Sequence, residues 1–342
     1  MPNTPPDTSA APVHHVVEPR FDVVGIGNAL VDVIARADDA FLAGEALAKG
    51  SMNLIDTERA VQLYRSLGSS VEMSGGSAAN TMCGIASFGG RAAYIGKVGD
   101  DDLGLVFGHD LRAVGVQFRA GAIEPGVPTG RSIILVTPDA ERTMNTYLGV
   151  SSLLDPADVH EATVASGRVL YMEGYLYDRP EAMEAFRFAA KVAHANGREV
   201  SLTLSDSFCV DRHREPFLEM VADDVDILFG NQDELCSLYR SSSLDAAIER
   251  VRRECRLAAI TCGARGSLVV TSDEVVEVPA EPVEQVLDTT GAGDLYAAGF
   301  LFGYTHDRSL AECGRLASIA AAEVISHVGP RPLVELRTLV DA

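Results

Sequence analysis

The chain has 342 residues, of which 28 are Lys or Arg and 49 are Asp or Glu, so its formal net charge is −21. This acidic balance, with 6% aromatic residues and no Trp, disfavours a surface for nucleic acid or anionic membranes and disfavours aromatic stacking platforms. Hydrophobic residues make up 47% of the chain, enough for the core of a large α/β domain.

The N-terminal segment, residues 1–20, is rich in Pro and Ala and has neither an apolar stretch nor a basic start. We therefore expect a disordered tail and not a signal peptide. The longest uncharged run, residues 73–90, contains five glycines, which excludes a lipid-facing helix. The six cysteines show no C-x-x-C pairing, which indicates the reduced thiols of a cytoplasmic protein without a zinc site.

From residue 21 onward, short apolar runs alternate with helical patterns. The first half predicts strands at 21–27 and 92–98 and helices at 57–67, 79–88 and 103–114. The second half predicts strands at 169–172, 200–204, 227–229, 258–261 and 267–271, and helices at 180–196, 215–221, 234–239, 244–253, 295–304 and 310–325. This alternation is typical of a mostly parallel sheet. Between the halves, residues 132–137 and 142–147 flank a Pro-Asp-Ala-Glu turn and predict an inserted β-hairpin.

The strongest motif is DTTGAGD at residues 288–294, followed by an apolar helical pattern. Gly291, Ala292 and Gly293 have small side chains or none, so their backbone N–H groups can approach an anion at the start of the helix. Asp294 lies in the first helical turn, where a carboxylate can accept a hydroxyl proton during phosphoryl transfer. Taken alone, the pattern also fits an Asp that caps a helix behind a tight glycine turn.

This motif, in combination with a second one, resembles the signatures of the ribokinase, or PfkB, family of sugar and nucleoside kinases. The second is GGSAAN at residues 75–80, which runs on to GG at 89–90 and GKVGD at 96–100. The resemblance covers about residues 21–332. It implies an α/β fold, a three-layer α/β/α sandwich with a mostly parallel central sheet and a small β-sheet lid. We expect the kinase domain at 21–342, with the lid inserted around 35–60 and 116–148.

On the donor side, the resemblance implies an ATP site in the C-terminal half. Asn231 and Glu234, in the sequence NQDE, match the family's N-x-x-E motif, in which the Glu orders Mg²⁺ through water. Thr261, Gly263 and Gly266 lie in a turn that would receive the phosphates and ribose of ATP. The start of a surface helix and a plain turn between strands are the alternative interpretations of these two segments.

Family members often use K⁺ beside the anion-binding turn that corresponds here to Gly291–Gly293. In this chain the implied positions are the main chain of Asp288 and Thr290, together with the turn at 326–329.

On the acceptor side, Asn28 and Asp32 resemble the polar pair that holds vicinal hydroxyls of a sugar or ribose. A carboxylate suits this role because it accepts hydrogen bonds from two neighbouring O–H groups. Gly75, Gly76 and Asn80 resemble the second wall of the same pocket. An ordinary capping role is the alternative for Asp32.

The segment at 25–32, GIGNALVD, is most similar to the adenosine-kinase branch of the family, as are the segments at 50–56, 142–147 and 204–208. A nucleoside needs an apolar slot for its base, and we expect Met52, Leu54, Leu135 and Tyr147 to supply it. Arg131, at the start of the hairpin, either approaches the substrate or phosphates or stays solvated.

We therefore expect an ATP-dependent kinase that uses Mg²⁺ and transfers a phosphoryl group to the 5′-hydroxyl of a ribonucleoside, adenosine first. A PfkB sugar kinase for ribose, fructose or ketodeoxygluconate is the alternative, and the protein would be a monomer or a homodimer. A catalytically silent nucleotide-binding regulator is disfavoured because Asp294, the glycines and Glu234 are all present. A dehydrogenase is disfavoured because the Gly25–Gly27 turn lacks a third glycine at the required spacing.

Overall fold

The computed structural model describes residues 18–121, 123–139 and 141–340. The tail expected over residues 1–20 lies almost entirely outside these ranges. Within them, no helix combines the length and the apolar character that crossing a membrane requires.

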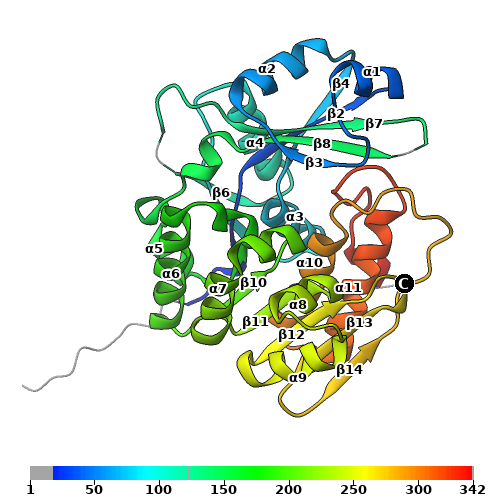
Figure 1. The fold of residues 1–342 in the computed structure, drawn as a ribbon. Helices are drawn as coiled ribbons and strands as arrows, with labels where there is room; N and C mark the ends of the chain where they lie inside the picture. The colour runs from blue at the N-terminus through cyan, green and yellow to red at the C-terminus, as the bar shows by residue number, and fades with distance from the viewer. Residues whose placement is uncertain (1–17, 122, 140, 341–342) are drawn as a thin grey trace, which may run out of the picture.

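The larger of two sheets has nine strands in the order β14-β13-β12-β11-β10-β9-β1-β5-β6 (Figure 1). Neighbouring strands run parallel, except that β13 is antiparallel to both β12 and β14. This confirms the prediction of a mostly parallel sheet. The strands are β1 Phe21–Ile26, β5 Ala92–Gly96, β6 Gln117–Ala120, β9 Gly167–Glu173, β10 Glu199–Thr203, β11 Ile227–Asn231, β12 Leu257–Thr261, β13 Ser267–Thr271 and β14 Val275–Val278.

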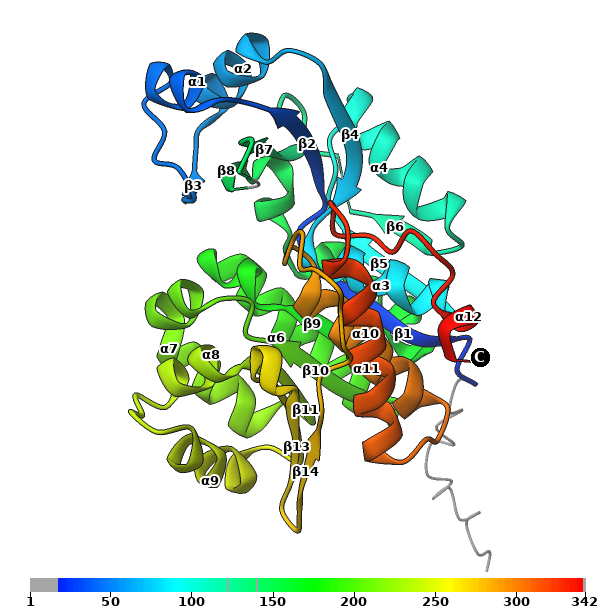
Figure 2. The same cartoon turned by 90° about the vertical axis from the view of Figure 1, so that its right-hand side faces the viewer.

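Helices cover both faces of this sheet and make three layers (Figure 2). One face carries α5 (Glu161–Ala165), α6 (Pro180–Ala195), α7 (Ser207–Asp223), α8 (Gln232–Leu238) and α9 (Leu244–Glu254), and the other carries α3 (Ser77–Ser87), α4 (Asp102–Ala113), α10 (Ala292–Thr305) and α11 (Leu310–Ile325). A short helix, α12 (Arg337–Val340), follows near the C-terminus. Short 3₁₀ turns lie at Gly149–Leu153, Pro156–Asp158, Gly174–Asp178 and Gly263–Arg265.

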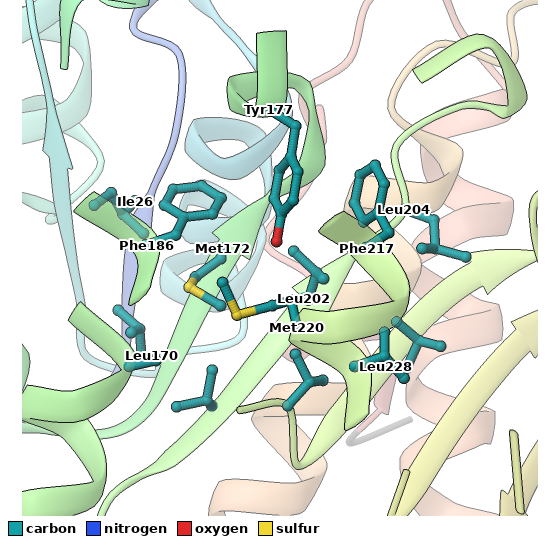
Figure 3. Close-up of a cluster of buried hydrophobic side chains, with 14 of the residues drawn as sticks. Ile26, Leu170, Met172, Tyr177, Phe186, Leu202, Leu204, Phe217, Met220 and Leu228 are labelled. Atoms are coloured by element: carbon teal, nitrogen blue, oxygen red, sulfur yellow. The ribbon is translucent and has the colours of Figure 1, made fainter. Parts of the chain in front are cut away.

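The core on the α6–α7 face is built from large apolar side chains of the strands and helices (Figure 3). Tyr177 stacks on Phe217 with ring centroids 4.2 Å apart and meets Phe186 edge-on at 5.8 Å. Both faces of the inner strands are therefore buried, as the continuous apolar runs in the sequence predict. This rigid body fixes the ends of its parallel strands, where the site lies.

The smaller sheet has five strands in the order β3-β8-β7-β2-β4 and lies above the three-layer body (Figures 1 and 2). They are β2 Leu30–Arg36, β3 Met52–Leu54, β4 Ser70–Gly75, β7 Gly130–Val136 and β8 Arg142–Tyr147. Two helices, α1 (Asp39–Gly44) and α2 (Thr57–Ser66), pack on one face of it over a small core of their own. We call this unit, residues 30–75 and 130–147, the lid.

The bounds of the lid differ from those expected. Its first strand begins at Leu30 and not near residue 35, and β4 extends it to Gly75. β4 was not predicted: its sequence, SVEMSG, has only two apolar residues, Val71 and Met73, and Val71 is exposed. β6, which fell within the range expected for the lid, instead pairs with β5 in the large sheet, because it follows α4 directly and completes a β-α-β unit.

Candidate active site

The site lies where the lid meets the large sheet. Four segments converge there: the β1–β2 connection, the turn from β4 into α3, the start of α10 and the segment that follows α11 (Figure 2). These segments are far apart in sequence, but they carry most of the residues that the motifs indicate.

Asp294 lies in the first turn of α10, directly behind the glycines of the DTTGAGD motif. Gly291 has φ +79°, and a Cβ there would lie 2.9 Å from Cα of Pro330, so the turn requires glycine. The Asp294 carboxylate accepts hydrogen bonds from Ser77 Oγ at 2.6 Å and from Asn80 Nδ2 at 2.9 Å. Burial raises the pKa of Asp294, and the two hydrogen bonds act in the opposite direction. The structure thus holds a partly desolvated carboxylate beside the N-terminus of a helix.

Asp32 lies on β2, on the face of the lid that points toward Asp294. Its side chain is 6% exposed. Gly75 is required opposite it, because a Cβ on Gly75 would lie 2.3 Å from Asp32 Oδ2. Burial raises the pKa of Asp32 to about 7, although the positive charges of Arg331 and Arg142 oppose the rise. The negative charge of Asp294 adds to the rise, so the two carboxylates interact across the junction of the lid and the large sheet.

Asn28 has a different surrounding from the one expected. Its Nδ2 donates to Glu173 Oε1 at 3.0 Å, and its Oδ1 accepts from Ser151 Oγ at 3.0 Å. Glu173 Oε2 also accepts from the backbone N–H of Ala78 at 2.8 Å, at the start of α3. With Asn28 1% exposed and bonded at both ends, the structure places it behind the site as a support, not as an open ligand for hydroxyls.

Glu173 is a site residue that the sequence reasoning missed. It ends the apolar strand β9 and is followed by glycine, which is a usable signal because a buried acid at a strand end needs partners. Burial raises the pKa of Glu173 to about 7. Gly76 has φ +90°, and a Cβ there would lie 2.2 Å from the carbonyl oxygen of Asn28, so this turn requires glycine. Glu173 and Gly76 together fix where α3 begins.

Arg131 does not face the site, and this corrects one branch of its expected role. In the ladder, Asp32 pairs with Ser132, so these two share a face and Arg131 lies on the other. There its guanidinium sits 5.8 Å from the ring centre of Tyr64 on α2. The arginine of the lid that does reach the site is Arg142.

The apolar side chains of the lid are also divided between its two faces. Leu135 is fully buried in the small core under α1 and α2, and Tyr147 pairs with Arg131, so neither faces Asp32. The expectation that Leu135 and Tyr147 line the base slot is therefore wrong.

Met52 and Leu54, the other two residues expected in the base slot, lie on the face that carries Asp32. They pair with Met144 and Thr146 and are 46% and 53% exposed. Ile34 and Ile134 lie on this same face beside them.

Arg142 connects the lid to the DTTGAGD segment. Its guanidinium forms an ion pair with Asp288 and donates to Thr290 Oγ1 at 2.9 Å. Asp288 also accepts from the backbone N–H groups of Thr290 at 3.0 Å and Gly329 at 2.8 Å. The structure therefore brings the 288–290 segment beside the 326–329 turn.

The NQDE segment begins α8 with a reciprocal capping box. Asn231 Oδ1 accepts from the backbone N–H of Glu234 at 2.9 Å, and Glu234 Oε2 accepts from the backbone N–H of Asn231 at 2.9 Å. The Glu234 side chain is 6% exposed, although Asp233 beside it is exposed, and burial raises the pKa of Glu234 to about 7. Across the described ranges, no cluster of three or more His, Cys, Asp or Glu is arranged to hold a metal directly.

The turn of Thr261, Gly263 and Gly266 lies next to this capping box, because Asn231 pairs with Thr261 in the parallel β11–β12 ladder. Gly263 has φ +60° and Gly266 has φ +87°. A Cβ on Gly266 would lie 2.0 Å from the carbonyl oxygen of Val278. The two C-terminal motifs thus form one continuous edge.

Comparison with known proteins agrees with this geometry. The sequence model of a family described as pfkB family carbohydrate kinase matches residues 37–336. A crystal structure of adenosine kinase from Sinorhizobium meliloti is 55% identical, with a TM-score of 0.87, over 94% of this chain and 98% of that one. A probable sugar kinase from Rhizobium etli CFN 42 is 48% identical, with a TM-score of 0.88 and the same coverage. Adenosine kinase 2 of Arabidopsis thaliana is 25% identical over 334 residues, 90% of this chain and 94% of that protein.

Proposed function

The chain belongs to the pfkB family of carbohydrate kinases, and within its adenosine kinase-like members we propose that it phosphorylates the 5′-hydroxyl of a ribonucleoside. ATP would be the donor, adenosine the preferred acceptor and AMP the product.

The observation that carries the proposal is the setting of Asp294 behind the glycine turn. Both carboxylate oxygens accept a hydrogen bond, from Ser77 and Asn80, which fixes the plane of the group. An acceptor hydroxyl placed against it would lose its proton to Asp294 as the phosphoryl group arrives. The backbone N–H groups of Gly291–Gly293, at the N-terminus of α10, would stabilise the charge on that phosphoryl group.

Asp32 and the apolar face of the lid support a nucleoside as acceptor. The Asp32 carboxylate would accept hydrogen bonds from the two vicinal hydroxyls of a ribose. The exposed side chains of Met52 and Leu54, on the face that Asp32 shares, would bury their surface only against a base. The 55% identity to the adenosine kinase of Sinorhizobium meliloti supports the same choice.

The metal ions belong to the proposal in a restricted form. Glu234 has both oxygens engaged by Asn231, and Asp206 and Asp233 add negative charge nearby, so the residues fit a hydrated Mg²⁺ and not a directly bound one. When bound near Glu234, Mg²⁺ would offset the negative charge of the phosphates. The main chain of Asp288 and Thr290, beside the 326–329 turn, would hold K⁺.

A free sugar is the second candidate acceptor, because the Rhizobium etli protein at 48% identity is described as a probable sugar kinase. The deciding experiment is a comparison of kcat/KM for adenosine, inosine, guanosine, 2′-deoxyadenosine, ribose and fructose, with ADP release as the readout. We expect adenosine to lead and 2′-deoxyadenosine to be poor, because it lacks one hydroxyl for Asp32. A free sugar ahead of every nucleoside would overturn the nucleoside assignment, and no ADP release with any acceptor would overturn both.

A further inference from the structure

The segment that follows α11 carries an arginine into the site. Residues 329–336 are tied down at three points: Gly329 N–H to Asp288 Oδ2 at 2.8 Å, Leu333 N–H to Glu323 Oε1 at 2.8 Å and Leu336 N–H to Ser87 Oγ at 2.9 Å. Pro330 packs against Gly291 of the glycine turn. Arg331, between these anchors, therefore projects from a fixed stretch of backbone.

The Arg331 guanidinium reaches β4 and α3. Its Nε donates to Asn80 Oδ1 at 2.8 Å, and its Nη2 donates to the Ser74 carbonyl oxygen at 2.8 Å and to Ser74 Oγ at 3.1 Å. Its Nη1 lies against the sulfur of Cys83. Every nitrogen of the planar group thus has a partner, and the fork is held in one orientation.

The contact to Asn80 decides which way that amide points. An amide side chain has one oxygen that accepts and one nitrogen that donates. Arg331 can only donate, so it must meet Oδ1. Nδ2 is then turned toward Asp294, where it donates to Oδ2 at 2.9 Å. In the flipped amide, Oδ1 would face the Asp294 carboxylate and both pairs would repel.

We propose that Arg331 is a positioning residue for phosphoryl transfer, which orients the Asn80 amide toward Asp294 and places a positive charge near this carboxylate. The proposal rests on Asp294 being the base in the proposed function. It adds a requirement from the C-terminal segment that neither family motif contains.

Electrostatics at Asp294 agree with the geometry. Burial raises the pKa of Asp294, and the charge of Arg331 is among the opposing influences, with the hydrogen bonds from Ser77 and Asn80. Other polar groups that interact with Asp294 come from the neighbouring strands and turns, and the carboxylates among them work against its ionisation. These groups are Asp32 of β2, Tyr171 and Glu173 of β9, and Tyr175 of the turn after β9; the carboxylates among them are Asp32 and Glu173.

The first test measures the carboxylate directly and needs no turnover. Protein with ¹³C-labelled Asp carboxyl carbons is titrated by NMR, and the Asp294 signal is assigned by its absence in Asp294→Asn. In Arg331→Met we expect the Asp294 midpoint to rise by about one pH unit, the lower end of the effect of a neighbouring opposite charge. Arg331→Lys should keep it within about 0.3 units of wild type, since the charge remains. An unchanged midpoint in Arg331→Met would overturn the electrostatic half of the proposal.

The second test is kinetic and separates positioning from folding. In Arg331→Met, the acid limb of kcat should move upward by the same amount, so kcat falls more at pH 6.5 than at pH 8.5 while KM for ATP stays unchanged. Asn80→Ala should cost less in the Arg331→Met background than in wild type, because the two residues act together. The matched control is Arg337→Met, which changes an exposed arginine at the start of α12 that pairs with Glu335, and it should leave the acid limb in place. Equal loss at every pH, with a matching fall in Tm, would show a structural role only.

The outcomes also distinguish this inference from the proposed function. If Asp294→Asn retains wild-type turnover, Asp294 is not the base, and the mechanism on which this inference rests fails while the phosphorylation of the nucleoside stands; if no acceptor gives ADP, the proposed function itself fails. The NMR midpoints would still decide whether Arg331 controls the ionisation of Asp294.

Discussion

Replacing Asp32 by Asn should stabilise the protein at neutral and basic pH while it removes function. Burial raises the pKa of Asp32 from 3.8 to about 7. A carboxyl group whose folded pKa exceeds its unfolded value contributes stability that is fully present below the unfolded pKa and is lost as pH rises through the folded pKa. The difference between 3.8 and about 7 corresponds to about 4 kcal/mol at pH 8 and about 2 kcal/mol at pH 5. Asn is a neutral isostere and escapes this penalty.

The assay is urea unfolding of wild type and Asp32→Asn at pH 4, 5, 6, 7 and 8. The gain in free energy of unfolding should grow from near zero at pH 4 to about 4 kcal/mol at pH 8. Asp273→Asn is the matched control, because Asp273 is exposed in the turn between β13 and β14, and it should change nothing measurable. A gain for Asp32→Asn that does not depend on pH, or a loss at pH 8, would refute the reasoning that burial disfavours the charged form.

Three further predictions concern the other site residues. Asp294→Asn should lower kcat by about 10²–10⁴-fold with little change in KM for ATP, the usual cost of losing a general base, and near-normal turnover would argue against that role. Glu234→Gln should leave Tm nearly unchanged, because Gln can complete the same capping box, while it raises the Mg²⁺ concentration needed for half-maximal rate; coincident Mg²⁺ titrations would reduce the motif to a helix start. Arg142→Met should lower kcat/KM by at least about tenfold, because it loses the buried ion pair with Asp288. Arg131→Met gives up only a contact to Tyr64, so it should cost about 0.5 kcal/mol of stability and leave kcat/KM intact. Equal effects of the two variants on kcat/KM would contradict the faces of the lid assigned to these arginines.

The parts of the molecule that the sequence predicted best are those with strong periodic or glycine patterns. The parallel strands of the large sheet are continuous apolar runs, and the helices on both faces show apolar residues at helical spacing. The glycines at 75, 76 and 291 each meet a steric need that the structure makes visible, at Asp32, Asn28 and Pro330. At these positions the glycine itself indicates that the fold leaves no room for a side chain.

The errors in the lid share one physical cause. Leu135 and Tyr147 were expected at the substrate side, as was Arg131 in one of its two alternatives, and all three lie on the other face or in the core beneath the helices. Successive strand residues point to opposite faces of a sheet, so the face that a residue occupies depends on the cross-strand register. The pairing of Asp32 with Ser132 cannot be predicted from one strand alone.

The residues that were missed depend on long-range contacts. Arg331 meets Asn80 across 251 positions of the chain, and Arg142 meets Thr290 across 148. Arg331 belongs to no motif singled out in the sequence, and Arg142 begins the 142–147 segment, whose resemblance assigned it no role. Glu173 could have been found, because an acidic residue closes an otherwise apolar strand at the edge where ligands of open α/β sheets bind.

The central claim is that the protein transfers a phosphoryl group to the 5′-oxygen of a ribonucleoside with Asp294 as the base. The most direct measurement is ³¹P NMR of the products formed from ATP and adenosine with wild type and with Asp294→Asn. We predict ADP together with a monophosphate signal split by the two 5′ protons for wild type, and neither at a comparable rate for the variant. ADP with inorganic phosphate alone, or a phosphoryl group on a 2′- or 3′-oxygen, would contradict the account.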